Sequence, residues 1–475
     1  MYVKKPDILM FMSDQHAYSY TGFTGHPVLE TPNLDRIARS GVSFDNMYTS
    51  CPLCVPARLS MITARMPSNI GVMNNPSLIS EDTATFLHAL VAAGYETVLC
   101  GRMHFKGCDQ LKGFSRRIFP ELLPSFWGKM CAPSRYLGRF AGTFAEYHCL
   151  DYTGADYSPV LEYDEHVIDA ALRYLSDEHD KPQFILVGTY GPHFSYVAPE
   201  AYYNKYLGRV PAPVATDASV DYEMPAIRHK QQFPPAETLD SARAAYCGMI
   251  DKLDGQIGAV YDRYQTYLSS SGRQGIFIYT SDHGDQVGER SLFGKKTFFE
   301  DSAKIPFFIT GAGIPVGVRC AQAAGIIDIA PTILRIALAQ ALPLQDGRAL
   351  DDDAPDTRFA LSECVIDDNP NGPTLGRMVK MDCWKYITYS GYERYDLLFN
   401  TRDDPHELHN ALAENRETAA LLRAKLAALK PASIVLREYA ERTLQQNVVG
   451  LYHDVMRFDD GRFMPTIPPK KHSGA

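Results

Sequence analysis

The sequence predicts an α/β fold, in which helices flank a large, mostly parallel central sheet and a small antiparallel sheet with one helix follows. Segments 8–12, 183–189 and 275–281 are almost entirely apolar, as expected for strands covered on both faces. Segment 239–268 between them repeats apolar residues at helical spacing. From about residue 376 the pattern changes to short strand-like runs, which indicate the smaller sheet.

The first predicted strand, 8–12, runs directly into Ser13-Asp14-Gln15-His16. Ligands of open α/β sheets bind at the carboxyl ends of the strands. Asp14 is therefore a candidate metal ligand, although a single Asp after a strand often only caps a turn.

A capped helix over 31–38 and a strand over 42–48 lead to Cys51-Pro-Leu-Cys54-Val-Pro56-Ala-Arg58. Pro56 suits the first position of a helix that continues to about residue 66, because its missing N–H costs nothing there. Cys54 would then lie just before the helix, where free N–H groups attract anions, and Arg58 would lie one turn further along. A nucleophile beside a fixed cation at a helix N-terminus predicts a site for a tetrahedral anion.

Cys54-X-Pro-X-Arg, followed by a short apolar helix and Thr63-X-Arg65, resembles the signature of the type I sulfatases, a branch of the alkaline-phosphatase-like superfamily. The resemblance implies the fold of that superfamily and oxidation of Cys54 to formylglycine (3-oxoalanine) by a formylglycine-generating or radical maturase. Ala57 and Ala64 stand where the family usually has Ser and Gly. Ala57 is also found among bacterial relatives that include choline sulfatases and phosphonate monoester hydrolases.

Other interpretations of this segment remain open. Cys51 and Cys54 form a C-x-x-C pair, which could be a redox pair or half of a zinc site, although no second C-x-x-C exists in the chain. A buried structural cysteine before a core helix is the third possibility.

Two further elements of the resemblance follow. Asn75 matches an asparagine that contacts the bound anion in choline sulfatases and phosphonate hydrolases; a simple turn before Pro76 is the alternative. A helix over 83–93 and a strand over 95–100 precede Gly101-Arg102-Met-His104, where the family usually has Gly-Lys-X-His. The resemblance implies that Arg102 replaces the lysine and that His104 contacts the gem-diol or the sulfate.

Strand 183–189 leads to Gly191-Pro192-His193, which resembles the Pro-His element of the family. His193 would protonate the leaving group. The irregular segments 105–160 and 194–235 are expected to form the walls of the substrate pocket.

A second strong motif follows strand 275–281, where the chain reads Asp282-His283-Gly284-Asp285. If this strand and strand 8–12 are neighbours, Asp282 and His283 meet Asp14 at one edge of the sheet. Further on, Lys295 lies five residues before a glutamate, as in the lysine element of the family, with Lys296 as the reserve candidate for substrate binding.

The resemblance implies one metal site and one cationic cradle. Carboxylate and amide oxygens favour Ca²⁺, with Mn²⁺ or Mg²⁺ as alternatives. The expected metal ligands are Asp14, Gln15, Asp282, His283 and the oxygen at position 54. The expected catalytic cradle consists of Arg58, Arg102, His104 and Lys295, and His193 and Lys295 would protonate the leaving oxygen.

We predict a catalytic domain over 1–375, an antiparallel subdomain over 376–435 and a tail over 436–475. The motif around 401–410 is similar to the C-terminal subdomain of sulfatases. The tail is expected to reach a neighbouring subunit or cover the pocket, which predicts a homo-oligomer, and a frayed tail is the alternative.

Composition excludes several classes of function. A net charge of −9 over 475 residues argues against nucleic-acid binding, and no run of eighteen apolar residues suits a membrane span. The apolar run 8–12 is too short for a signal-peptide core, so we expect a cytoplasmic protein.

Three functions remain. The first is hydrolysis of a small organic or aryl sulfate ester through a formylglycine made from Cys54. The second is hydrolysis of phosphonate monoesters or phosphodiesters with the same nucleophile and metal, which Gln15, Ala57, Asn75 and His283 also fit. The third is a non-catalytic anion-binding protein, which would follow if Cys54 stays a thiol.

Overall fold

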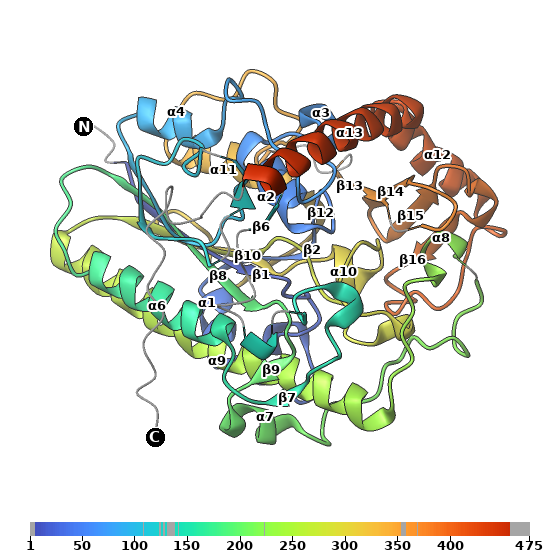
Figure 1. Cartoon of the computed structure of the whole chain (residues 1–475). Coiled ribbons are helices and arrows are strands. Elements are labelled where there is room, and N and C mark those ends of the chain that lie inside the picture. The colour runs from blue at the N-terminus through green and yellow to red at the C-terminus, as the bar shows by residue number, and fades with distance from the viewer. Residues whose placement is uncertain are drawn as a thin grey trace.

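A computed structural model describes residues 5–107, 109–122, 125–126, 129–130, 138–140, 142–222, 224–352, 358–367 and 369–456. Among these residues, eight strands form the central sheet in the order β12-β2-β11-β10-β1-β8-β3-β4 (Figure 1). The bounds, in chain order, are β1 Asp7–Asp14, β2 Gly41–Tyr48, β3 Glu96–Gly101, β4 Arg116–Phe119, β8 Gln183–Pro192, β10 Gly275–Ser281, β11 Phe307–Gly311 and β12 Val318–Gly325. Only β11 runs antiparallel to its neighbours, so the prediction of a mostly parallel sheet is confirmed.

The register of β1 is what brings the motifs together. β1 pairs in parallel with β10 from Asp7↔Gly275 to Ser13↔Ser281, so the residues that follow both strands lie side by side. On its other side β1 pairs with β8, where Asp14 lies opposite Pro192. β3 lies next to β8. The expectation that strands 8–12 and 275–281 are neighbours is confirmed.

Alternate residues of β1 enter different cores, as expected for a strand covered on both faces. Met10 and Met12 pack in the cluster that contains Leu59 of α2. Phe11 packs in the opposite cluster with Ile257 of α9. Figure 1 shows α6 and α9 along one face of the sheet and α2, α4 and α11 on the other. The helices of the two layers are α1 Pro32–Arg39, α6 Pro159–Tyr174 and α9 Ala236–Ser271, and α2 Cys54–Thr63, α4 Phe86–Ala92 and α11 Ile329–Ile336.

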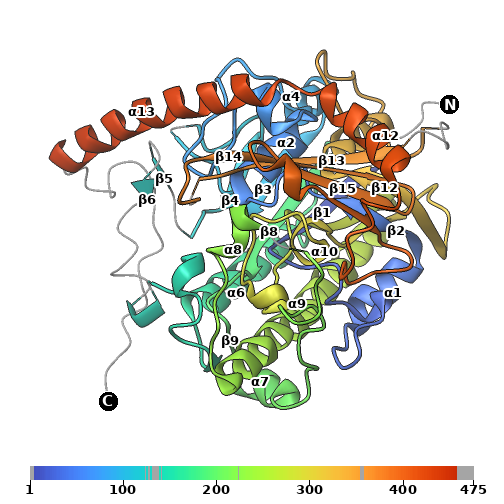
Figure 2. The same cartoon turned by 90° about the vertical axis from the view of Figure 1, so that its right-hand side faces the viewer.

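A separate sheet of four antiparallel strands follows, and helix α12 packs against it (Figure 2). The bounds are β13 Phe359–Ile366, β14 Thr374–Met381, β15 Trp384–Tyr389, β16 Leu397–Asn400 and α12 Arg416–Ala427. The predicted boundary at residue 376 lies inside β14, and the sheet to which β14 belongs already begins with β13. The first part of the predicted tail, up to residue 456, is helical and belongs to α13 Ala432–Met456. Residues 457–475 lie outside the described part of the chain.

The remaining α-helices and strands in the described part of the chain are short. They are α3 Pro67–Ile70, α7 Glu200–Tyr206, α8 Pro225–Arg228, α10 Glu300–Ala303, β5 Ser125–Phe126, β6 Lys129–Met130, β7 Gly154–Ala155 and β9 Val197–Ala198. Within the described residues, no helix combines the length and the apolar character needed to cross a bilayer.

The predicted start and end of the signature helix were wrong. Helix α2 begins at Cys54 rather than at Pro56, and Leu53 is its N-cap. It ends at Thr63, because Ala64 adopts a left-handed conformation with φ 55°. Proline is tolerated throughout the first turn, where backbone N–H groups have no intrahelical acceptor. Pro56 therefore predicts the first residue of the helix only to within one turn.

Candidate active site

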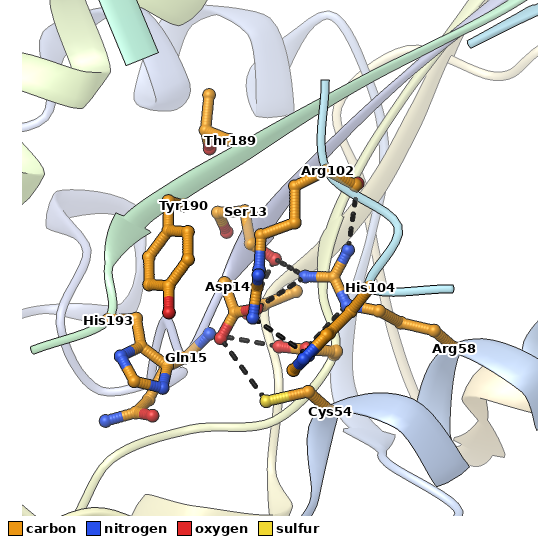
Figure 3. Close-up of polar contacts among 12 residues, drawn as sticks. Ser13, Asp14, Gln15, Cys54, Arg58, Arg102, His104, Thr189, Tyr190 and His193 are labelled. Carbon is orange, nitrogen blue, oxygen red and sulfur yellow. Dashed lines mark hydrogen bonds and ion pairs between the residues drawn. The ribbon is translucent and has the colours of Figure 1, made fainter. Parts of the chain in front are cut away.

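The functional side chains lie where four strand ends meet the N-terminus of α2. Asp14 ends β1, Arg102 follows β3, His193 follows β8 and Asp282 follows β10. Cys54 is the first residue of α2 and is buried. Figure 3 shows Asp14, Arg102, His193 and Cys54 converging on one space.

Asp14, Cys54, Asp282 and His283 form a group suited to a metal ion. One potential ligand atom from each lies within 4.8 Å of all the others. His283 Nε2 lies 3.2 Å from Cys54 Sγ, and Asp14 Oδ1 lies 3.7 Å from the same atom. His283 Nδ1 lies 2.9 Å from the carbonyl oxygen of Gly284, which favours the tautomer whose Nε2 lone pair faces the group. Burial lowers the pKa of His283, but the Asp282 carboxylate outweighs burial and raises the pKa above its ordinary value. A divalent cation would have to displace that proton, and two carboxylates with the resulting neutral imidazole fit such a cation.

Gln15 adds an oxygen at the edge of this group. Its backbone has φ 67°, and its N–H donates to Asp282 Oδ1 at 3.0 Å. The side-chain amide donates to Asp285 at 2.6 Å, and its Oε1 accepts from Lys295 Nζ at 2.8 Å. The predicted ligand oxygen of Gln15 therefore faces the site.

Two buried arginines surround Asp14. Arg58 donates to Asp14 Oδ2 at 3.0 Å and to Asp282 Oδ2 at 2.8 Å. Arg102 donates to Asp14 Oδ2 at 2.6 Å and to Glu121 Oε1 at 3.1 Å. Burial raises the pKa of Asp14, but the charges of Arg102 and Arg58 outweigh burial and hold the pKa well below its ordinary value. Asp14 is therefore an ionised carboxylate, as a metal ligand must be.

His104 lies between two cations. Its Nδ1 is 2.9 Å from Arg102 Nη2, and its Nε2 is 3.0 Å from Lys106 Nζ. Burial and the charges of Arg102 and Lys106 lower the pKa of His104 well below its ordinary value, so the ring is neutral. A neutral imidazole accepts at only one nitrogen, so the two cations compete for it.

Lys295 connects His193 to the nucleophile position. Its ammonium group lies 3.1 Å from Cys54 Sγ and 3.0 Å from His193 Nε2. His193 Nδ1 lies 2.6 Å from the Phe194 carbonyl oxygen and donates to it, which leaves Nε2 to accept from Lys295. Burial and the Lys295 charge lower the pKa of His193 well below its ordinary value, so the proton of this pair resides on Lys295.

The Cys54 side chain lies in contact with Asp14, His283 and Lys295. Burial and the Asp14 carboxylate raise the pKa of its thiol, but Lys295 and His283 outweigh them, and the pKa lies below its ordinary value.

Two predicted substrate-binding residues have different surroundings. Asn75 Oδ1 accepts the backbone N–H of Val55 at 3.0 Å, so its side chain caps the first turn of α2. Lys296 pairs with Asp367 at 2.8 Å, outside the group formed around Cys54. Of the two adjacent lysines, only Lys295 contacts the nucleophile position.

Sequence reasoning missed several residues that hold the site in place. Glu121 accepts the backbone N–H of His104 at 2.8 Å as well as Arg102, but it lies in an irregular segment without a recognisable pattern. Asp285 accepts from Gln15, from Tyr196 and from the Gly294 N–H. Asp285 could have been predicted from the sequence, because it is the second carboxylate after the buried strand β10.

Comparisons with known proteins identify relatives that match most of the chain. A family model described as sulfatase matches residues 6–339. A choline-sulfatase of Rhizobium meliloti is 31% identical over 437 residues, which cover 86% of this chain and 83% of that protein. An arylsulfatase of Clostridium perfringens is 27% identical, with 86% and 90% covered. The crystal structure of a phosphonate monoester hydrolase of Agrobacterium radiobacter superposes with a TM-score of 0.69 at 21% identity, over 93% of this chain and 95% of that one.

Proposed function

The chain belongs to the sulfatase family of hydrolases, and from that premise we propose that it cleaves a small organic or aryl sulfate ester to an alcohol and inorganic sulfate. The observation that carries the proposal is the buried group of Asp14, Cys54, Asp282 and His283, whose ligand atoms lie within 4.8 Å of one another. This group combines a nucleophile position with a cation site in one enclosed space.

The nucleophile of the proposal is formylglycine, made from Cys54 by a separate maturase. Water adds to the aldehyde to give a gem-diol, and one of its hydroxyl oxygens attacks sulfur while the alcohol leaves. Loss of the proton from the second hydroxyl then restores the aldehyde and expels sulfate. A serine or a thiol lacks this second hydroxyl and would need an external water to release the sulfate.

The basic side chains receive the charge of the transferring group. Arg58, Arg102 and Lys295 are buried and positively charged around Cys54, so they stabilise anionic oxygens without first having to reorganise. A divalent cation, for which we propose Ca²⁺ with Mn²⁺ or Mg²⁺ as alternatives, would be held by Asp14, Gln15, Asp282 and His283. When bound, it lowers the pKa of the nucleophile and offsets the negative charge of the ester.

Lys295 and His193 supply the proton for the leaving oxygen. Lys295 Nζ holds the proton and donates to His193 Nε2 at 3.0 Å, so a proton can pass from one to the other and on to the leaving alcohol. An anionic ester next to the pair would raise the pKa of His193 and favour that transfer.

Phosphonate monoester or phosphodiester hydrolysis is the second candidate. It is supported by Gln15, which brings an uncharged amide oxygen to the site, and by the structural likeness to a phosphonate monoester hydrolase. The two functions are distinguished by measuring kcat/KM of the same preparation for p-nitrophenyl sulfate and for p-nitrophenyl phenylphosphonate. We expect the sulfate to be the better substrate, and the reverse order would assign the second function.

A further inference from the structure

Tyr190 is a buried tyrosine at the carboxyl end of β8 that none of the motifs includes. Its side chain is 4% exposed. The guanidinium carbon of Arg102 lies 3.9 Å from its ring centroid, and the His193 ring meets it edge-on at 5.2 Å between centroids. Both flanking side chains belong to the site, so the ring is held between two functional groups.

The hydroxyl of Tyr190 points into the site. In Figure 3 it extends toward the space between Asp14 and His193, on the side where Cys54 lies. The charged neighbours that act on it are Arg102, Asp14, Cys54 and Glu121. The first three belong to the group around the nucleophile position.

No residue in the described part of the chain makes a hydrogen bond to this hydroxyl, although buried tyrosines normally have a partner. Tyr190 Oη is not among the fully buried polar atoms that lack a partner, so this oxygen keeps some accessible surface. Burial also keeps the pKa of the phenol above its ordinary value, so the hydroxyl is a donor at neutral pH. An uncommitted donor therefore faces the place where an anion would bind.

We propose that Tyr190 Oη donates a hydrogen bond to a non-bridging sulfuryl oxygen of the bound ester, which makes Tyr190 a further substrate-binding residue. This inference rests on the proposed sulfatase function. The non-bridging oxygen is favoured over the leaving oxygen because Lys295 and His193 already supply the proton on the leaving side, whereas Tyr190 is stacked on Arg102.

Tyr190→Phe tests the inference, because it removes the hydroxyl and keeps the ring beside Arg102. We expect kcat/KM for p-nitrophenyl sulfate to fall about 10- to 100-fold, the usual effect of one hydrogen bond to a charged group. The inhibition constant of inorganic sulfate should rise about 10-fold, and Tm should not change. Tyr264→Phe is the matched control, since Tyr264 is equally buried but donates to the Ile276 carbonyl oxygen, outside the site.

A series of aryl sulfates locates the contact. The loss in Tyr190→Phe should be the same for all leaving groups, and a loss that grows with leaving-group pKa would overturn the assignment to a non-bridging oxygen. Unchanged kcat/KM and unchanged sulfate inhibition would overturn the role of Tyr190 altogether. If the wild-type protein hydrolyses no sulfate ester, the proposed function fails, and calorimetric titration of both proteins with inorganic sulfate still decides whether Tyr190 binds the anion.

Discussion

Lys295 and Lys296 are adjacent in sequence, yet their ammonium groups have different partners. Lys295 contacts Cys54, Gln15 and His193, whereas Lys296 pairs with Asp367. The left-handed backbone of Lys296, with φ 64°, separates the two side chains. The pair is therefore a natural comparison of a buried and a peripheral cation.

Replacing each lysine by methionine should give very different activities. Lys295→Met should lower kcat for p-nitrophenyl sulfate by about 10²- to 10⁴-fold, because it removes both a charge beside the nucleophile and the proton of the leaving-group pair. Lys296→Met should change kcat less than about threefold. Equal losses in the two variants, measured by steady-state kinetics, would contradict the assignment of Lys295.

Arg102 shows why a lysine is not equivalent in this chain. Its guanidinium donates to Asp14 and Glu121, contacts His104 and stacks on Tyr190. A lysine side chain has a single ammonium nitrogen, so it cannot contact three partners that are positioned for the forked donors of a guanidinium.

Arg102→Lys should therefore lower kcat/KM by about 10- to 100-fold, even though the family usually has a lysine here. Arg36→Lys is the matched control, because Arg36 also forms a forked pair, with Asp262, but does so at the surface. Full activity of Arg102→Lys would show that the charge alone is needed.

Most residues of the candidate site could be predicted from the sequence, because residues that directly follow buried parallel strands lie at the same edge of the sheet. The sequence identified Asp14, Cys54, Asp282 and Lys295, which the structure brings together. It could not identify Glu121, because that residue reaches the site through an irregular segment whose path no local pattern determines.

At the scale of elements, α6 holds the end of β8 through Asp164. Both carboxylate oxygens of Asp164 accept backbone N–H groups, from Tyr190 and from Gly191, at 2.7 Å. These bonds fix the turn that carries His193. Burial raises the pKa of Asp164 to about 7, although the two backbone donors oppose this.

The raised pKa predicts a pH dependence of stability. Between pH 4 and 7 the folded protein holds more protons at Asp164 than the unfolded chain does, so this group makes the free energy of unfolding fall as pH rises. Asp164→Asn cannot titrate. It should be less stable than wild type at pH 4, because one backbone N–H loses its acceptor, and the gap should narrow toward pH 7.

Denaturant unfolding of both proteins at several pH values measures this gap. Asp169→Asn, an exposed position on the same helix, is the control and should show a constant difference from wild type. A gap between wild type and Asp164→Asn that stays constant or widens with pH would contradict the role of burial at Asp164.

Sequence patterns located the buried elements better than those at the edges. The strands β1, β8 and β10 are buried along their whole length and were predicted, with boundary errors of a few residues. β12 was missed, because this edge strand exposes much of its first half and lacks a continuous apolar run.

The whole molecule depends on a site that concentrates charge in its interior. Asp14, Arg58, Arg102 and Asp282 are all buried, and their two negative and two positive charges cancel. A bound divalent cation would make the site net positive, which suits an anionic ester. If the proposed cation binds only the folded state, a concentration of about 100 times its Kd should stabilise the protein by about 2.7 kcal/mol.

Removal of metal should therefore lower both activity and Tm. Dialysis against a chelator should abolish hydrolysis, and Ca²⁺, Mn²⁺ and Mg²⁺ added back separately identify the ion by the recovery of each property. In His283→Ala the added ion should raise Tm much less, whereas in His26→Ala, away from the metal group, it should act as in wild type. A Tm that responds equally in both variants would place the ion elsewhere.

The central claim is that position 54 carries an oxygen nucleophile, and mass spectrometry of the active enzyme tests it most directly. The tryptic peptide from Ser40 to Arg58 contains Cys51 and Cys54, and fragmentation separates the two. We predict that position 54 has lost about 18 Da, the difference between a cysteine and a formylglycine residue, while Cys51 is unchanged. A fully active preparation in which Cys54 is entirely an unmodified thiol would contradict the account.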